Sequence, residues 1–187
     1  SLAERIIPAA DLSEQISMAG KEASGTSNMK FMMNGALTLG TLDGANVEIL
    51  EAVGSENAYI FGATEDELPE LRKNYQPREA YASVPGLKRV LDALVDGTLD
   101  DGGTGDFHDL LATLLDGTSW EPADVYYLLG DFADYRETRD QMAADYRDQI
   151  SWARKCWINI CESGRFSSDR TISDYASQVW KLEATAV

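Results

Sequence analysis

The stretch EASGTSNMK, residues 22–30, decides how the rest of the chain is interpreted. Its small and hydroxyl-bearing residues are typical of a helix start, where unpaired backbone N–H groups attract anions. Thr26 and Lys30 are four residues apart, so on a helix they share one face. That face can offer a hydroxyl, backbone amides and an amine to a phosphate-bearing ligand. From the spacing alone, an ordinary capped helix followed by a solvated lysine is the simpler interpretation.

The residues on either side alternate between apolar runs and turn signals. Five elements are expected in order: a strand or extended segment in 11–17, a helix over 26–33, a strand in 36–42, a helix over 45–53 and a strand in 58–61. The dipeptides Asn34-Gly35 and Asp43-Gly44, together with Gly54, separate the later elements. Strands and helices that alternate at this spacing predict parallel βαβ units and therefore an α/β fold.

The remaining chain is expected to be mostly helical. Capping boxes at Ser1–Glu4 and Thr64–Glu67 predict two helix starts, and we expect an exposed loop over 96–106. The short apolar run Tyr126–Leu129 is compatible with one more strand. The last third carries apolar stripes at helical spacing, which predict either core or a docking face for a domain outside this chain. The stripe residues are Ile150, Trp152, Ala153, Cys156, Trp157, Ile160, Ile172, Tyr175, Ala176 and Val179.

Composition excludes several classes of partner and site. Sixteen basic and thirty-two acidic residues give a formal net charge of −16, which disfavours nucleic acid and anionic membrane surfaces but not a neutral polysaccharide. Cys156 and Cys161 lack the spacing of a metal site, so we expect no metal, two buried thiols and a reducing, cytoplasmic compartment. Because the sequence opens directly on a helix, without a strand to feed it, we expect the chain to be a piece of a larger protein.

Two longer stretches resemble the cofactor region of the α-glucan phosphorylases, which comprise the glycogen, starch and maltodextrin enzymes. They read GKEASGTSNMKF at residues 20–31 and NGALTLGTLDGANVE at residues 34–48. The resemblance returns at SGRFSSDRTI, residues 163–172. It implies two Rossmann-like domains of the glycosyltransferase-B type, with the active site between them. Residues 1–130 would form the later part of the C-terminal domain, which binds the cofactor and the glucosyl group, and residues 131–187 a helical segment packed on it.

The same resemblance implies an enzyme, a cofactor and substrates. In the family, inorganic phosphate cleaves the terminal α-1,4-linked glucose of a glucan and releases glucose 1-phosphate. Pyridoxal 5′-phosphate is held as a Schiff base on the lysine that matches Lys30, and its phosphate exchanges a proton with the substrate phosphate. Thr26 and Ser27 match residues that hold the cofactor phosphate, and Gln15 matches a position close to the cofactor. The full enzyme is expected to be an allosterically controlled homodimer.

The resemblance also assigns the sugar contacts and one departure. Glu22 matches the residue that hydrogen-bonds the glucosyl hydroxyls, and Ala23, Ser24 and Gly25 match residues whose backbone N–H groups face the same sugar. The family usually has glycine where this chain has Ser27, so the contact between that residue and the phosphate is open. Without the surrounding motif, Glu22 would be interpreted as a solvated acid and Thr26 as a simple helix cap.

By the same resemblance, the substrate-phosphate arginine, two lysines near the phosphates and the glycine loop of the family would all lie before Ser1. The chain alone is therefore expected to be inactive. One alternative is a non-catalytic module that binds sugar or phosphate, or contacts a protein through its acidic helices. Another is a pyridoxal enzyme of a different reaction class, which the sequence EASG at residues 22–25 disfavours because it suits a sugar hydroxyl and not an amino-acid carboxylate.

Overall fold

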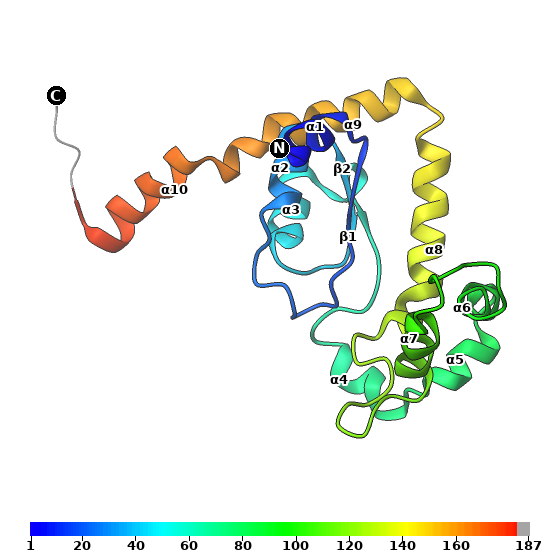
Figure 1. Ribbon diagram of the computed structural model, residues 1–187. Coiled ribbons are helices and arrows are strands. Elements are labelled where there is room, and N and C mark those ends of the chain that lie inside the picture. The colour runs from blue at the N-terminus through cyan, green and yellow to red at the C-terminus, as the bar shows by residue number, and fades with distance from the viewer. Residues whose placement is uncertain (183–187) are drawn as a thin grey trace.

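The structure, a computed structural model, describes residues 1–182 and contains a parallel sheet with helices around it (Figure 1). Its three strands, ordered as they follow one another in the sequence, are β1 (Leu12–Gln15), β2 (Leu37–Gly40) and β3 (Tyr59–Ile60). Leu12 pairs with Leu37 at one end of the first ladder, and Leu39 pairs with Tyr59 in the second. The α/β fold that the sequence predicts is confirmed for the described part of the chain.

Short helices connect these strands and pack beside them. They are α1 (Leu2–Ile6), η1 (Ile7–Ala9), α2 (Ser27–Met33), α3 (Ala45–Val53) and η2 (Ser55–Asn57). The expected starts and ends of these helices are confirmed. Ser1 and Glu4 form the capping box of α1, Asn34 follows α2, and Gly54 ends α3 with φ of +81°. The strand–helix alternation thus follows directly from turn chemistry that is local in the sequence.

The middle of the chain forms a helical region below the sheet in Figure 1. Its elements are α4 (Leu68–Leu71), η3 (Arg72–Asn74), α5 (Pro77–Ser83), α6 (Leu87–Asp92) and α7 (Asp106–Leu115). The capping contacts at Thr64 are present, because its N–H and hydroxyl donate to Glu67 at 2.9 and 2.8 Å, and α4 begins one residue later. Leucines from α6, α7 and α8 make a separate small core there.

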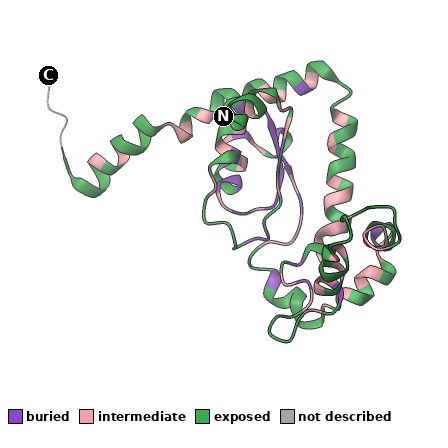
Figure 2. Cartoon of the chain, in the orientation of Figure 1, coloured by how far each residue is buried: buried purple, intermediate pink, exposed green. Residues whose placement is uncertain are grey.

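Two long helices then join the helical region to the sheet. They are α8 (Leu128–Asp145) and α9 (Gln149–Glu162), and they are followed by η4 (Ser163–Phe166), α10 (Ser168–Asp174) and the π-helical turn η5 (Tyr175–Trp180). Trp152 of α9 is buried with Leu37 and Leu39 of β2 and with Tyr59 and Phe61. Figure 2 shows that burial concentrates in the strands and in the helix faces turned toward them.

The prediction of a strand at Tyr126–Leu129 is wrong, since Leu128 already begins α8. The reason is a side-chain cap: the buried Asp124 carboxylate accepts hydrogen bonds from the backbone N–H groups of Leu128 and Leu129, both at 2.8 Å. Those amides are orphan donors of a first helical turn, and an acceptor placed before them favours a helix. Asp124 and Tyr127 both take positive φ values, which a strand would not allow.

The prediction of two buried thiols is wrong for Cys161 and only partly right for Cys156. Cys156 is half-buried, and burial raises the pKa of its thiol, whereas Cys161 is exposed. The stripe on α9 is likewise divided: Trp152 is buried, but Ile150 and Trp157 are exposed. A helix 14 residues long presents all its faces, and only the one turned to the sheet is covered within residues 1–182.

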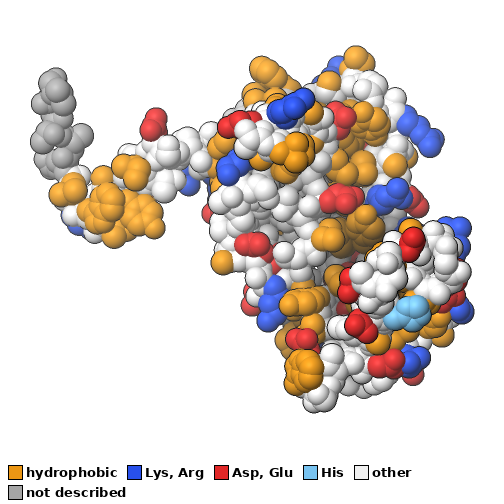
Figure 3. Space-filling view, viewed as in Figure 1, with side chains coloured by type: hydrophobic (Ala, Val, Ile, Leu, Met, Phe, Trp, Pro, Cys, Tyr) orange, Lys and Arg blue, Asp and Glu red, His pale blue; other side chains and the backbone are white. Residues whose placement is uncertain are grey.

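Residues 168–180, which we call the C-terminal arm, extend away from the sheet (Figure 1). The apolar stripe of the arm is exposed at Ile172, Tyr175 and Val179. Figure 3 shows apolar side chains gathered over the end of the arm. The stripe is therefore not core in this chain, and its use as a docking face stays a prediction. No helix within residues 1–182 is both long and apolar enough to cross a bilayer.

The buried side chain of Leu39 gives a direct test of the central strand. Leu39 is 0% exposed and belongs to the core cluster that includes Trp152. Replacing it by alanine should lower the free energy of unfolding by about 2–5 kcal/mol, because the methyl groups are lost and a cavity remains. Urea unfolding followed by circular dichroism measures the change. Val90→Ala on the exposed face of α6 is the control, and an equal loss there would contradict the placement of Leu39 in the core.

Candidate functional site

The residues singled out by the sequence lie at one edge of the sheet, where the parallel strands end. Gln15 is the last residue of β1, and the loop after it carries residues 22–25 into α2. The turn after β2, residues 41–44, reaches the same edge. In open α/β sheets, ligands bind outside the carboxyl ends of the strands, so this edge is where a site is expected.

The start of α2 has donors without acceptors. Thr26 is the N-cap residue, but its side chain makes no capping hydrogen bond. Within residues 1–182 the backbone N–H groups of Thr26 and Ser27 have no acceptor either. Gln15 Nε2 lies 3.5 Å from Ser27 Oγ, which joins the end of β1 to the start of the helix. The structure thus brings Gln15, Thr26 and Ser27 together, and the free hydroxyl of Thr26 argues against a purely capping role.

Lys30 lies one turn further along the same helix. Its backbone N–H donates to the carbonyl oxygen of Thr26 at 3.3 Å, which places the two residues on one face as the spacing predicts. The side chain is exposed, and its ammonium has no hydrogen-bond or ion-pair partner in the described part of the chain. A free amine beside unpaired amides and a hydroxyl can bind an anion or react with a carbonyl.

The loop that carries Glu22 is held by the turn after β2. The Asp43 carboxylate, 7% exposed, accepts hydrogen bonds from the backbone N–H groups of Gly20 at 3.0 Å, Lys21 at 3.2 Å and Glu22 at 2.7 Å. Ala45 N–H donates to the Ser24 carbonyl at 2.7 Å. Residues 20–24 therefore have a fixed backbone, although the side chains of Glu22 and Ser24 are exposed.

The carboxylate of Glu22 has little to hold it. Its one contact among the described residues is the backbone N–H of Ser24, at a long 3.4 Å. Its neighbour Ala23 is exposed, and Gly25 takes φ of +84°, which the bend into α2 requires. The Glu22 side chain is exposed, and the backbone N–H groups of Ala23 and Gly25 have no acceptor within residues 1–182, so these groups can bind hydroxyls.

A pair of buried asparagines connects the two helices of the site. Asn28 of α2 donates from Nδ2 to Asn46 Oδ1 of α3 at 3.1 Å, and Asn46 Nδ2 donates to the carbonyl of Thr41 at 3.0 Å. Thr41 Oγ1 in turn donates to the Ser17 carbonyl at 2.5 Å. Buried polar groups that are mutually satisfied rigidify a core, so α2, α3 and the loop after β1 are fixed relative to one another.

Sequence reasoning missed this supporting set, of which Asp43 and Asn46 are the central members. The sequence pattern indicates only a turn at Asp43-Gly44. A detectable signal exists, because an acid lies three residues after the end of a fully buried strand, and in a parallel sheet that position reaches the ligand edge. Asn28 and Asn46 offer no such signal, since asparagine inside a helix is usually solvated.

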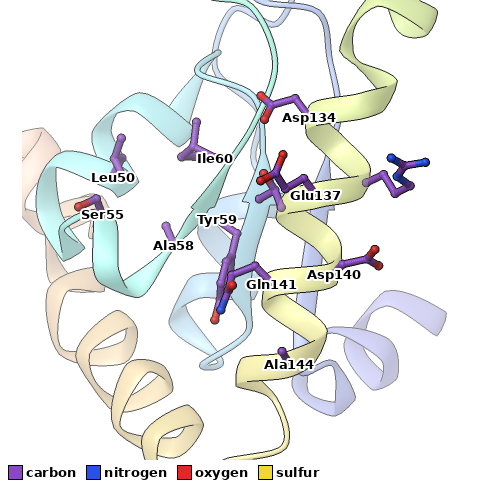
Figure 4. A pocket seen from close by; sticks show the side chains of 12 residues that line it. Leu50, Ser55, Ala58, Tyr59, Ile60, Asp134, Glu137, Asp140, Gln141 and Ala144 are labelled. Carbon is purple, nitrogen blue, oxygen red and sulfur yellow. The ribbon is translucent and has the colours of Figure 1, made fainter. Parts of the chain in front are cut away.

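A wider cleft lies elsewhere. It has a volume of about 920 Å³ and runs between α8 and the segment around β3 (Figure 4). Asp134, Glu137 and Asp140 line its α8 side, and none of the sequence-predicted site residues reaches it. A second cleft, of about 440 Å³, follows the end of β1 and includes Gln15 and Lys21. Residues 1–182 contain no group of three or more His, Cys, Asp and Glu side chains that could hold a metal ion.

The close approach at Gly44 generates a prediction about the loop. Gly44 has φ of +51° and ψ of −139°, and a Cβ added there would lie 2.5 Å from the Ser24 carbonyl oxygen. Gly44→Ala should therefore displace residues 22–24 and cost about 1–3 kcal/mol of backbone strain. Gly105→Ala is the control, because Gly105 also has positive φ but open space around it. Limited proteolysis within residues 20–26 should increase for Gly44→Ala alone, and equal cleavage of both variants would contradict the prediction.

Comparison with known proteins gives a consistent result along the chain. The family model described as carbohydrate phosphorylase matches residues 1–182. The chain is 48% identical over 185 residues to a glycogen phosphorylase of Synechocystis, 46% identical over 185 residues to one of Bacillus subtilis, and 45% identical over 184 residues to the human muscle form. Each alignment covers 98% of this chain but only 21–22% of the relative, so the chain spans about a fifth of the length of these proteins. Because the family model covers nearly all of its residues, the chain belongs to the carbohydrate phosphorylase family.

Proposed function

We propose that this chain is the cofactor-bearing segment of an α-glucan phosphorylase, in which inorganic phosphate cleaves the terminal α-1,4-linked glucose of a glucan to give glucose 1-phosphate. The observation that carries the proposal is the family match over residues 1–182, with relatives named glycogen phosphorylase at 45–48% identity. The segment EASGTSNMK lies inside that match, at the edge of the sheet where ligands of α/β proteins bind.

The donor set at the start of α2 fits pyridoxal 5′-phosphate. Lys30 supplies the amine for covalent attachment, and the Thr26 hydroxyl with the Thr26 and Ser27 amides supplies donors for the phosphate. Gln15 lies at the end of β1, and its Nε2 is 3.5 Å from Ser27 Oγ, where it can orient the Ser27 hydroxyl. When bound, the cofactor supplies a phosphate group that can exchange a proton with the substrate phosphate. The serine at position 27 keeps the backbone amide and adds a second hydroxyl near the anion.

The loop before α2 fits the sugar. Glu22 offers a carboxylate to the glucosyl hydroxyls, and hydrogen bonds to a charged acceptor are the strong kind. The backbone N–H groups of Ala23, Ser24 and Gly25 serve the same sugar. Glu22 is exposed, and the one hydrogen bond that its carboxylate makes among the described residues, to Ser24, is long, so a ligand can replace that bond at little cost.

We further propose the larger setting of the segment. Residues 1–130 would belong to the C-terminal Rossmann-like domain of a glycosyltransferase-B enzyme, and residues 131–187 to the helices that complete it. The division near 130 falls inside α8, which links the helical region to the sheet. The full enzyme would be a cytoplasmic homodimer that acts on an α-1,4-glucan and inorganic phosphate.

Covalent attachment at Lys30 is the experiment that tests the proposed function. Borohydride reduction of the full-length protein should fix a pyridoxyl group on the peptide that contains Lys30, as peptide mass spectrometry detects. Lys30→Ala should lose the label and all phosphorolysis. Lys21→Ala removes an exposed lysine of the adjacent loop and should keep the label. An unlabelled, colourless wild-type protein would favour a non-catalytic binding module instead.

The isolated chain is predicted to be inactive. Phosphoryl transfer depends on positioned positive charge, and residues 22–30 contain only one basic side chain, that of Lys30. Purified residues 1–187, supplied with pyridoxal 5′-phosphate, glucan and phosphate, should release no glucose 1-phosphate in a coupled assay. The full-length protein at the same concentration is the positive control. Turnover by the isolated chain would show that the upstream residues are not needed.

A further inference from the structure

Asp43 is a buried acid that the proposed reaction does not use. Its carboxylate is 7% exposed, and within residues 1–182 no lysine or arginine pairs with it. A buried charge is costly unless hydrogen bonds replace its lost water. Three backbone N–H groups do so here, from the consecutive residues Gly20, Lys21 and Glu22. The Asp43 carboxylate and the loop therefore stabilise each other, because the buried charge is stable only while the loop amides point toward the carboxylate.

The shortest of the three bonds, at 2.7 Å, is made by the N–H of Glu22 itself. Among the described residues, the Glu22 side chain makes one hydrogen bond, at 3.4 Å to the N–H of Ser24, so its direction depends on its main chain. Two residues later the Ser24 carbonyl is bonded to Ala45, at 2.7 Å. Residues of the turn after β2 therefore make hydrogen bonds to the loop backbone on both sides of the Glu22 side chain.

We propose that Asp43 is a positioning residue for sugar recognition, which aims the Glu22 carboxylate and the adjacent amides at the glucosyl group through its bonds to the loop backbone. This inference rests on the proposed function and adds a residue to it. Asp43 itself would not touch the sugar, because its carboxylate is enclosed by the loop. The start of α2 is held separately, through Asn28 and Asn46, so the cofactor donors should not depend on Asp43.

The decisive variant is Asp43→Asn in the full-length enzyme. An amide in place of the carboxylate turns an NH₂ group toward at least one backbone N–H, so at least one of the three bonds is lost. We expect kcat/KM for glucose 1-phosphate in glucan synthesis to fall about 10- to 100-fold, the range for losing a hydrogen bond to a charged group. The amount of pyridoxyl group fixed on Lys30 should remain that of the wild type.

A double variant separates positioning from general stability. If Asp43 acts through Glu22, then the losses caused by Asp43→Asn and Glu22→Gln should be less than additive in the double variant, because both weaken the contact that the Glu22 side chain makes. Asp124→Asn is the matched control: Asp124 is 4% exposed and also accepts two backbone N–H bonds, but it lies at the start of α8. It should lower stability and leave kcat/KM within about twofold of the wild type. Should Asp43→Asn not accumulate as folded protein, Asp43→Ser, which keeps one acceptor, is measured in the same way.

Three results would overturn the positioning role: an unchanged kcat/KM for the Asp43 variant, full additivity with Glu22→Gln, or an equal loss in Asp124→Asn. These are distinct from failure of the proposed function itself. That failure would appear in the wild-type protein, as the absence of a pyridoxyl group on Lys30.

Discussion

A buried negative charge, which within residues 1–182 accepts hydrogen bonds from backbone amides alone, organises the ligand edge of this chain. The Asp43 carboxylate can be stable out of water only where several N–H groups converge on it, and the loop after β1 supplies three. The parallel sheet makes this meeting possible, because it brings the ends of β1 and β2 to the same edge. The family motif therefore extends beyond the residues that would touch a ligand, into the turn that shapes their backbone.

The elements near the motif could be predicted because their boundaries are set by local chemistry. Glycine and asparagine at Asn34-Gly35, the Asp43-Gly44 turn and Gly54 end or begin elements regardless of what packs around them. The failures arise where a contact that the apolar pattern does not reveal decides the outcome. Tyr126–Leu129 has the composition of a strand, but the Asp124 side chain satisfies helical amides instead. The apolar stripe predicts that α9 is covered around Cys161. Within the described residues, no other element covers the face of α9 that carries Cys161.

The sequence predicts which residues the candidate site brings together, but it does not predict how far those residues are enclosed. Gln15, Glu22, Thr26 and Lys30 fall on one edge because strand end, loop and first helical turn follow one another in sequence. They are exposed or only half-buried within the described residues, and this chain spans about a fifth of its relatives' length. The supporting asparagines were not predictable, since their role depends on the packing of α2 against α3.

The uneven burial of the four tryptophans has an optical consequence. Trp152 is 4% exposed and stacked beside Tyr59 at 6.1 Å, whereas Trp120, Trp157 and Trp180 are 83%, 66% and 53% exposed. Emission from the buried indole belongs at shorter wavelength and is shielded from iodide, while the other three emit as solvated indoles. One chromophore thus reports on the sheet, a second on the loop before α8, and two on the outer faces of α9 and the arm. If another protein surface covered α9 and the arm, iodide would quench Trp157 and Trp180 less and leave the quenching of Trp120 unchanged.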